Sequence, residues 1–113
     1  MEITALKRRE DFLKLRNSPK TGTPAFLMAA RVRRDDNSCT RVGLTVTKKL
    51  GGAVVRNRIK RRLRAAVSES FPAFAAPGTD YVLIARRAAE TRDFAILLDD
   101  MKRALLRLSG DIK

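Results

Sequence analysis

Residues 48–64 of this chain read Lys48-Lys49-Leu50-Gly51-Gly52-Ala53-Val54-Val55-Arg56-Asn57-Arg58-Ile59-Lys60-Arg61-Arg62-Leu63-Arg64. Eight of these side chains are cationic, and no acidic residue occurs between Asn37 and Ser68. The two glycines allow the backbone to turn, and beyond them apolar residues recur at the four-residue spacing of one helical face, at Val55, Ile59, Leu63 and Val67. The sequence therefore predicts a helix that displays its cations.

The charge pattern of this helix is unusual. A solvated helix face normally mixes Glu with Lys, whereas here like charges stand three and four residues apart, and each such pair costs a few tenths of a kcal/mol. A bound polyanion would relieve that repulsion. The excess of Arg over Lys agrees, because guanidinium groups bond phosphates in a bidentate way. An ordinary solvated face is the alternative interpretation.

Composition limits the possible classes of protein. With 113 residues the chain has room for one domain, residues 1–113, with one modest core. A formal net charge of +13 indicates a nucleic-acid partner first and an anionic membrane surface second. The longest apolar stretch, Ala25 to Ala30, is too short to span a bilayer, and Met1 to Arg9 has no secretory apolar region. We expect a cytoplasmic protein without a membrane partner.

The rest of the chain predicts an α+β sandwich, in which helices pack against a sheet. Its elements, in order, are a short helix over Glu10–Arg16, strands over Pro24–Arg33 and Cys39–Thr47, the basic helix over Ala53–Ser70 closed by Phe71-Pro72, an apolar strand over Asp80–Ala85, and a last helix with apolar residues from Phe94 to Leu108, capped by Thr91 and stopped by Gly110. If one of these predicted strands is divided into two, the sheet has one more strand.

Catalytic groups are scarce. The chain has no histidine, and its single cysteine, Cys39, therefore has no imidazole to activate it or to share a metal; a small buried strand residue is the expectation. The acidic pairs Asp35-Asp36 and Asp99-Asp100 are not spaced convincingly for two Mg²⁺ ions. We expect no catalytic residue and no metal ligand in the protein itself.

The segment from Lys48 to Arg61 closely resembles the Arg-Asn-Arg signature of the protein subunit of bacterial ribonuclease P. The resemblance extends over essentially the whole chain. Leu6-Lys7 with Glu10-Asp11-Phe12 resembles the N-terminal helix of that family, Arg41 to Thr47 the strand before the signature, and Asp80 to Arg86 the strand after it. Several matches in the right order are a far more specific indication than a basic helix alone.

The resemblance implies a fold and a function. The implied fold is a single-domain α-β-β-β-α-β-α sandwich with a left-handed β-α-β crossover, which is opposite to the usual hand. The implied function is that of the RNA-binding subunit of an endoribonuclease, whose RNA subunit performs the Mg²⁺-dependent removal of the 5′ leader from precursor tRNA. The protein alone would be inactive, and Mg²⁺ would be held mainly by the RNA.

The resemblance also implies two binding surfaces. The leader of precursor tRNA would contact Phe12, Arg16 and Phe26, although plain core packing is the alternative for Phe12. A second aromatic that is usual one turn after Phe12 is Arg16 here, and a tyrosine frequent three residues after Phe26 is Ala29. The catalytic RNA would contact Lys48, Lys49, Arg56, Asn57, Arg58, Lys60, Arg61 and Arg64.

Three other classes compete with this interpretation. A ribosomal or other structural RNA-binding protein shares the size, the charge and the lack of catalytic groups. A helix-turn-helix DNA binder is disfavoured because a strand, not a helix, precedes the basic helix. A peripheral membrane protein would need a bulky apolar helix face rich in Trp or Phe, and Val55, Ile59 and Leu63 are better explained as core residues.

Overall fold

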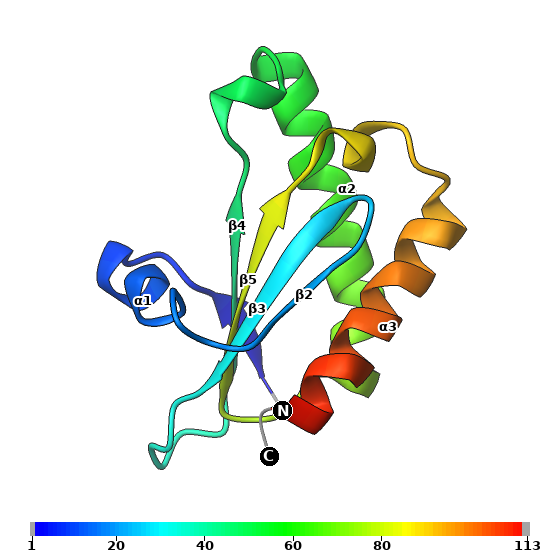
Figure 1. The fold of residues 1–113 in the computed structure, drawn as a ribbon. Helices are drawn as coiled ribbons and strands as arrows, with labels where there is room; N and C mark the ends of the chain where they lie inside the picture. Colours follow the sequence, from blue (N-terminus) through cyan, green and yellow to red (C-terminus); the bar gives the residue numbers. More distant parts are fainter. Residues whose placement is uncertain (1, 112–113) are drawn as a thin grey trace.

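The computed structural model describes residues 2–111 (Figure 1). Its elements, in chain order, are β1 (Ile3–Ala5), α1 (Arg9–Lys14), β2 (Lys20–Gly22), β3 (Phe26–Val32), β4 (Thr40–Thr45), the 3₁₀ turn η1 (Lys48–Leu50), α2 (Ala53–Phe74), β5 (Thr79–Ala85), the 3₁₀ turn η2 (Arg87–Glu90) and α3 (Phe94–Asp111). Within residues 2–111, none of the helices is long and apolar enough to cross a membrane.

One five-stranded sheet, in the order β1-β4-β5-β3-β2, organises the fold. β5 lies at its centre, parallel to β4 and antiparallel to β3. A strand in this position has neighbours at both edges and packing on both faces, which explains why its residues Tyr81 to Ala85 are continuously apolar. The predicted apolar strand over Asp80–Ala85 is therefore present, as the central strand of the sheet.

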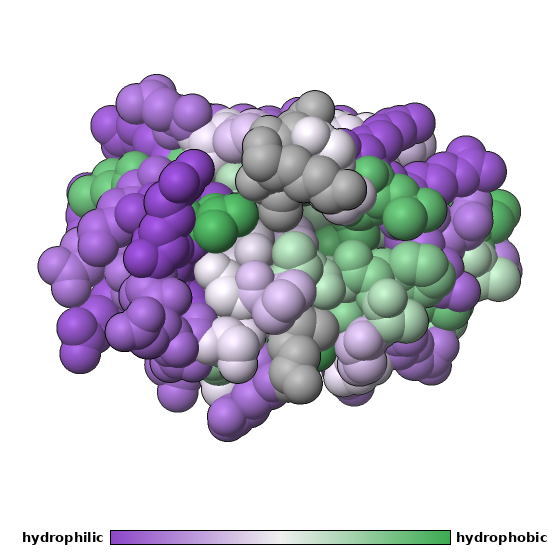
Figure 2. All heavy atoms as spheres, turned by 90° about the horizontal axis from the view of Figure 1, so that it is seen from below, coloured by the Kyte–Doolittle hydropathy of each residue, from purple (hydrophilic) through white to green (hydrophobic). Residues whose placement is uncertain are grey.

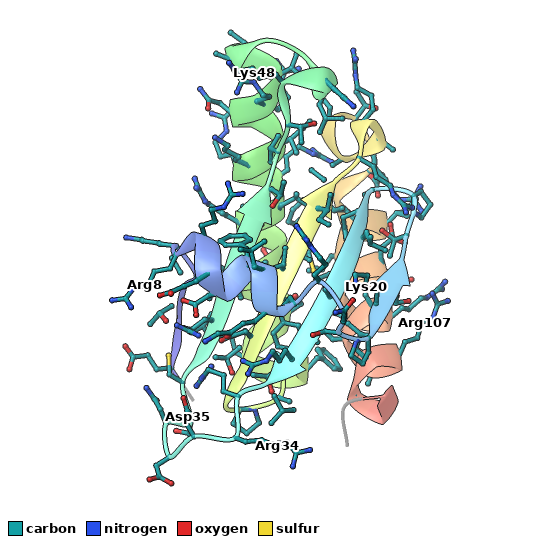
Figure 3. The ribbon with its side chains drawn as sticks, turned by 60° about the vertical axis from the view of Figure 1, so that its left-hand side comes forward. Arg8, Lys20, Arg34, Asp35, Lys48 and Arg107 are labelled. Atoms are coloured by element: carbon teal, nitrogen blue, oxygen red, sulfur yellow. The ribbon has the colours of Figure 1, made fainter. Side chains whose placement is uncertain are left out.

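Helices cover both faces of the sheet. α2 and α3 pack on one face, and the short α1 crosses the other (Figures 1 and 3). The larger core lies between the sheet and the two long helices, where the rings of Phe71 and Tyr81 meet edge to face with centroids 5.1 Å apart. A smaller cluster under α1 contains Leu6, Leu15, Ala29 and Val82, with Phe12 packed against it.

The connection from β4 through α2 to β5 is left-handed. In Figure 3 the two long helices lie behind the sheet, β4 and β5 both run upward, and β5 stands to the right of β4. A right-handed crossover, which parallel strands nearly always use, would place β5 to the left in this view. The implied crossover is therefore present.

The structure corrects several predicted boundaries. Two strands were not predicted from the residue pattern: β1 precedes α1, and β2 precedes the predicted strand Pro24–Arg33, which is present as β3. Three-residue strands are too short to show a periodic pattern. α2 does not end at Phe71-Pro72 but continues to Phe74, because a proline in the last turn removes only one backbone donor. Asp93, not Thr91, caps the start of α3: its carbonyl accepts the amide of Leu97, and its carboxylate accepts the amide of Ile96. α3 also continues past Gly110.

A buried ion-pair network joins the elements around Asp80 of β5, whose side chain is 1% exposed. Arg41 of β4 donates from Nη2 to Oδ2 of Asp80 at 2.6 Å and from Nε to Oδ1 at 2.8 Å. Arg33 donates to Oδ1 at 2.8 Å, and Arg41 also reaches Asp11 of α1 at 3.3 Å. The hydrogen bond to Asp80 raises the pKa of Arg41 despite its partial burial. The network thus holds α1 against the sheet.

Candidate RNA interface

The entrance of α2 is shaped by two glycines. Gly51 has φ of +140°, a conformation that side chains rarely adopt, and a Cβ there would stand 3.0 Å from Cβ of Val55. Gly52 follows as the extended N-cap residue of α2. The tight turn places Lys48 and Lys49, both exposed on η1, beside the first turn of α2, at one tip of the molecule (Figure 3).

The polar side chains in the N-terminal half of α2 point in three directions. Asn57 and Arg61 are exposed on its outer side. Arg58 and Arg62 face η2, where their partners lie. A third row, which we call the edge row, follows the opposite flank at four-residue spacing and consists of Arg56, Lys60 and Arg64. The structure therefore brings all eight residues assigned to the RNA-subunit interface onto α2 and its entrance.

Two neighbouring arginines of α2 have different roles. Arg58 lies 3.2 Å from the carboxylate of Glu90 and is half exposed, so it can exchange that partner for a phosphate. Arg62 donates to the carbonyls of Ala89 and Arg92 and thereby fastens η2 to the helix. Among the described residues, none of the other seven interface residues has a carboxylate partner.

The cations of α2 are unevenly distributed along the helix. After Arg64, the remainder of α2 carries only one charged residue, Glu69. Figure 2, which shows the end opposite Lys48, has hydrophilic residues on its left and a more apolar area on its right. Within α2, the cations are therefore confined to the part of the helix between Arg56 and Arg64.

A shallow groove of about 280 Å³ lies on the other face of the sheet, beside α1. We call it the α1 groove. Its lining is mostly apolar and also includes two cationic residues, Arg16 and Lys20. The complete lining is Phe12, Leu13, Leu15, Arg16, Lys20, Ala29, Thr45, Val82 and Ile84.

Phe12 and Arg16 therefore lie together, as the resemblance implies, and Ala29 leaves the floor of the groove open. Phe12 is half-buried: it packs against the small cluster under α1 and also lines the groove. Core packing and a binding role are both compatible with that position. Lys20, Val82 and Ile84 were missed from the sequence. Alternation along β5 could have revealed Val82 and Ile84, because they point away from the face of Tyr81 and Leu83.

Phe26 does not belong to this groove, and its assignment to the leader surface is wrong. Its side chain is 0% exposed in the core between the sheet and the long helices. Successive residues of a strand point to opposite faces, so Phe26, Met28 and Ala30 face α2 and α3, while Ala29 faces α1. The family pattern placed the right strand in the groove, but the register decided which of its residues face it.

Several carboxylates pair with arginines. Asp35 pairs with Arg33 at 3.1 Å, Asp99 with Arg103 at 2.9 Å and Asp100 with Arg92 at 2.5 Å. The hydrogen bond to Asp100 raises the pKa of Arg92. Within residues 2–111 there is no group of three or more His, Cys, Asp or Glu residues placed to hold a metal ion. Cys39 is half-buried just before β4, with its Sγ 3.2 Å from Oγ1 of Thr4.

Comparison with known proteins gives one consistent family. A sequence model described as "Ribonuclease P" matches residues 2–109. The ribonuclease P protein component of Caulobacter vibrioides is 46% identical over 112 residues, covering 99% of this chain and 75% of that one. The corresponding protein of Ruegeria pomeroyi is 45% identical, covering 94% and 86%.

Solved structures agree with the sequence comparison. The RNase P protein of Thermotoga maritima superposes with a TM-score of 0.73 at 27% identity, covering 96% of this chain and 97% of that one. The Staphylococcus aureus RNase P protein shares the fold, with a TM-score of 0.77 at 24% identity, covering 92% and 94%. A basic helix entered through two glycines, a left-handed crossover and these relatives lead to one conclusion: the chain belongs to the family of bacterial ribonuclease P protein components.

Proposed function

We propose that this chain, as the protein subunit of the tRNA 5′-processing enzyme ribonuclease P, binds two RNAs on two surfaces. The basic helix binds the catalytic RNA, and the α1 groove binds the single-stranded 5′ leader of precursor tRNA. The observation that carries this proposal is the placement of the two surfaces on opposite faces of one sheet, because a single small domain can then hold both RNAs at once.

The basic helix supplies electrostatic binding. Exposed Arg61 and the edge row present guanidinium and ammonium groups that lack carboxylate partners among the described residues, so they are available to phosphates. Each contact releases counterions from the RNA, which makes assembly strongly salt-dependent. Placing these charges between two polyanions also lowers the repulsion between the catalytic RNA and its substrate.

The α1 groove suits an unpaired strand. Its apolar floor can receive bases, and the half-buried ring of Phe12 offers a stacking surface. Arg16 and Lys20 stand beside it, where they can contact phosphates or stack on bases. Because Ala29 and Arg16 replace two aromatic positions, leader binding in this protein depends less on stacking and more on charge.

Mg²⁺ acts on the RNA in this proposal, where it supplies the activated water and the charge stabilisation that cleavage needs. The side chains of the protein do not fit that role. Asp80, the most buried carboxylate, is bonded through both oxygens to Arg33 and Arg41, and Asp35, Asp99 and Asp100 each pair with an arginine. The protein contributes binding and orientation, and no proton transfer is assigned to it.

Reconstitution tests the proposal. The purified protein is mixed with a bacterial ribonuclease P RNA and precursor tRNA at low Mg²⁺, where the RNA alone is slow. We expect the mixture to remove the leader and the protein alone to leave the substrate intact. Specific cleavage by RNA-free protein that survives nuclease treatment of the preparation would overturn the proposal. So would preferential binding to ribosomal RNA.

A further inference from the structure

A second hollow, of about 440 Å³, opens at the edge of the sheet between β1, β4 and α2. We call it the edge groove. It shares no lining residue with the α1 groove and lies on the opposite face of the sheet, the face covered by α2. The lining comprises Ile3, Thr4, Ala5, Leu6, Lys7, Val42, Leu44, Arg64, Val67 and Ser68.

One wall of the edge groove is apolar. Ile3, Val42, Leu44 and Val67 are partly buried and pack against the main core, yet each still lines the hollow. Water in contact with this wall gains few hydrogen bonds, so a flat, weakly polar group would replace it favourably. The size of the hollow falls within the range of small-ligand sites, about 300–1,000 Å³.

The other wall offers unpaired backbone groups. β1 is an edge strand bonded only to β4, with the amide of Thr40 donating to the carbonyl of Glu2 at 2.8 Å and the amide of Leu6 donating to the carbonyl of Val42 at 2.9 Å. In a strand, alternate residues direct their N–H and C=O groups to opposite sides. The backbone donors and acceptors of Ile3 and Ala5 therefore point away from β4, and no other strand within residues 2–111 pairs with them.

The rim of the edge groove is cationic. Lys7 and Arg64 are exposed, and neither has a carboxylate partner among the described residues. Arg64 is the last member of the edge row, whose side chains follow one another at about 6 Å along α2, the rise of four residues. An RNA backbone whose phosphates contact the edge row in turn would therefore reach the edge groove at Arg64.

We infer that the edge groove binds one unpaired nucleotide of the RNA subunit. Its base lies against Val42 and Val67, the edge of the base bonds to the free backbone groups of Ile3 and Ala5, and its phosphate meets Arg64 and Lys7. A peptide strand could also add to β1, but the absence of a carboxylate in the lining and the two cations at the rim favour a polyanion. The inference deepens the proposed function and rests on it.

The experiment uses the single cysteine of the chain. In a Cys39→Ser background, Ser68→Cys is labelled with benzophenone maleimide, a bulky uncharged group that also crosslinks on illumination. Ala95→Cys, labelled in the same way, is the matched control on the exposed start of α3. With the label at position 68 filling the groove, we expect binding to the RNA subunit to weaken about tenfold, the scale of one lost base contact. The control should bind as the unlabelled protein does.

Crosslinks identify the occupant. Illumination of the assembled holoenzyme should attach the label at position 68 to one unpaired nucleotide of the catalytic RNA. Replacing that nucleotide by an abasic residue should weaken binding of the unlabelled protein while leaving the labelled protein little changed, because both changes remove the same contact. Additive losses, crosslinks confined to paired RNA or to protein, or unchanged affinity of the labelled protein would each overturn the inference. If the unlabelled protein fails to assemble with the RNA, the proposed function itself has failed.

Discussion

The ring of Phe12 lies so close to the backbone of Gly43 that a Cβ atom on Gly43 would stand 2.4 Å from Cζ and 2.7 Å from Cε1 of the ring. No Cβ atom tolerates such contacts. The missing side chain in β4 therefore creates the slot that seats an aromatic side chain of α1 against the sheet, and this seat fixes one side of the α1 groove.

Gly43→Ala should displace Phe12 and weaken leader binding. The ring is half-buried and can swing outward, so we expect a modest loss of stability together with a fall in the ratio of precursor to mature tRNA affinity of the holoenzyme. Gly110→Ala is the matched control, because a Cβ there meets nothing within 4 Å. A Gly43→Ala protein with an unchanged ratio would show that the position of Phe12 does not matter for the leader.

Replacing Phe12 by alanine should affect leader binding, whereas replacing Phe26 by alanine should affect mainly the stability of the fold. Phe26→Ala empties a site that is 0% exposed, so it should cost roughly 3–5 kcal/mol of unfolding free energy. Phe12→Ala should cost less stability but lower the precursor preference, because only the precursor has a leader to stack on the ring. Denaturant unfolding and tRNA binding measure the two effects. A loss of precursor preference in a folded Phe26→Ala protein, with none in Phe12→Ala, would reverse the assignment made here.

Three arginines of α2 should respond differently to replacement by alanine. Arg61 is exposed without a carboxylate partner among residues 2–111, so its loss should weaken assembly with the RNA subunit and leave the melting temperature unchanged. Arg58→Ala should also weaken assembly, with a small change in stability from the lost pair with Glu90. Arg62→Ala should destabilise the fold by roughly 1–3 kcal/mol, because it removes the bonds to Ala89 and Arg92.

Glu90→Gln tests the same ion pair from its acidic side, because it replaces the carboxylate with a neutral amide of similar size. It frees Arg58 from its carboxylate and should therefore strengthen RNA binding and steepen its salt dependence. Thermal unfolding measures the stability of these variants, and RNA binding across a salt series measures their affinity and its salt dependence. If Arg61→Ala affects folding more than assembly, Arg61 stabilises the fold and does not contact the RNA.

Asp80→Asn should be the most damaging polar substitution of the sheet. The change leaves Arg33 and Arg41 without their shared buried carboxylate, and removing one partner of such a pair costs roughly 3–5 kcal/mol. Asp35→Asn, which removes an exposed partner of Arg33, is the control and should cost far less. Urea unfolding of both proteins makes the comparison, and equal losses would mean that the buried network contributes no more than a surface pair.

Tyr81 should make the stability of the protein fall at alkaline pH. Burial raises the pKa of its hydroxyl, against the opposing effect of the hydrogen bond from the amide of Ala76. The folded state therefore holds the proton more tightly than the unfolded state, so this stabilisation is complete below about pH 10 and declines as the pH rises through the folded pKa. Because the chain has one tyrosine, tyrosinate absorbance reports this group directly. A titration with the ordinary tyrosine pKa would contradict the prediction.

Residue patterns alone were sufficient for the main elements. The four-residue spacing of Val55, Ile59 and Leu63 predicts α2, and the apolar run from Tyr81 to Ala85 predicts β5. The run of cations marks α2 as the helix that we propose to bind RNA. These features depend on periodicity and local charge, which are properties of the chain itself. The left-handed crossover could not be predicted from such patterns, because parallel strands are usually joined by right-handed crossovers. Only the family resemblance implied it.

The order of residues was enough to predict the class of fold and the cation-rich helix, because helical periodicity and a run of like charges depend on neighbouring residues. Which side chains share a surface followed only from the packing of distant segments. The register of β3 sends Phe26 into the core, the slot at Gly43 seats Phe12, and the pairing of β1 with β4 creates the edge groove. Each of these depends on contacts between residues far apart in sequence, and no local pattern records such contacts.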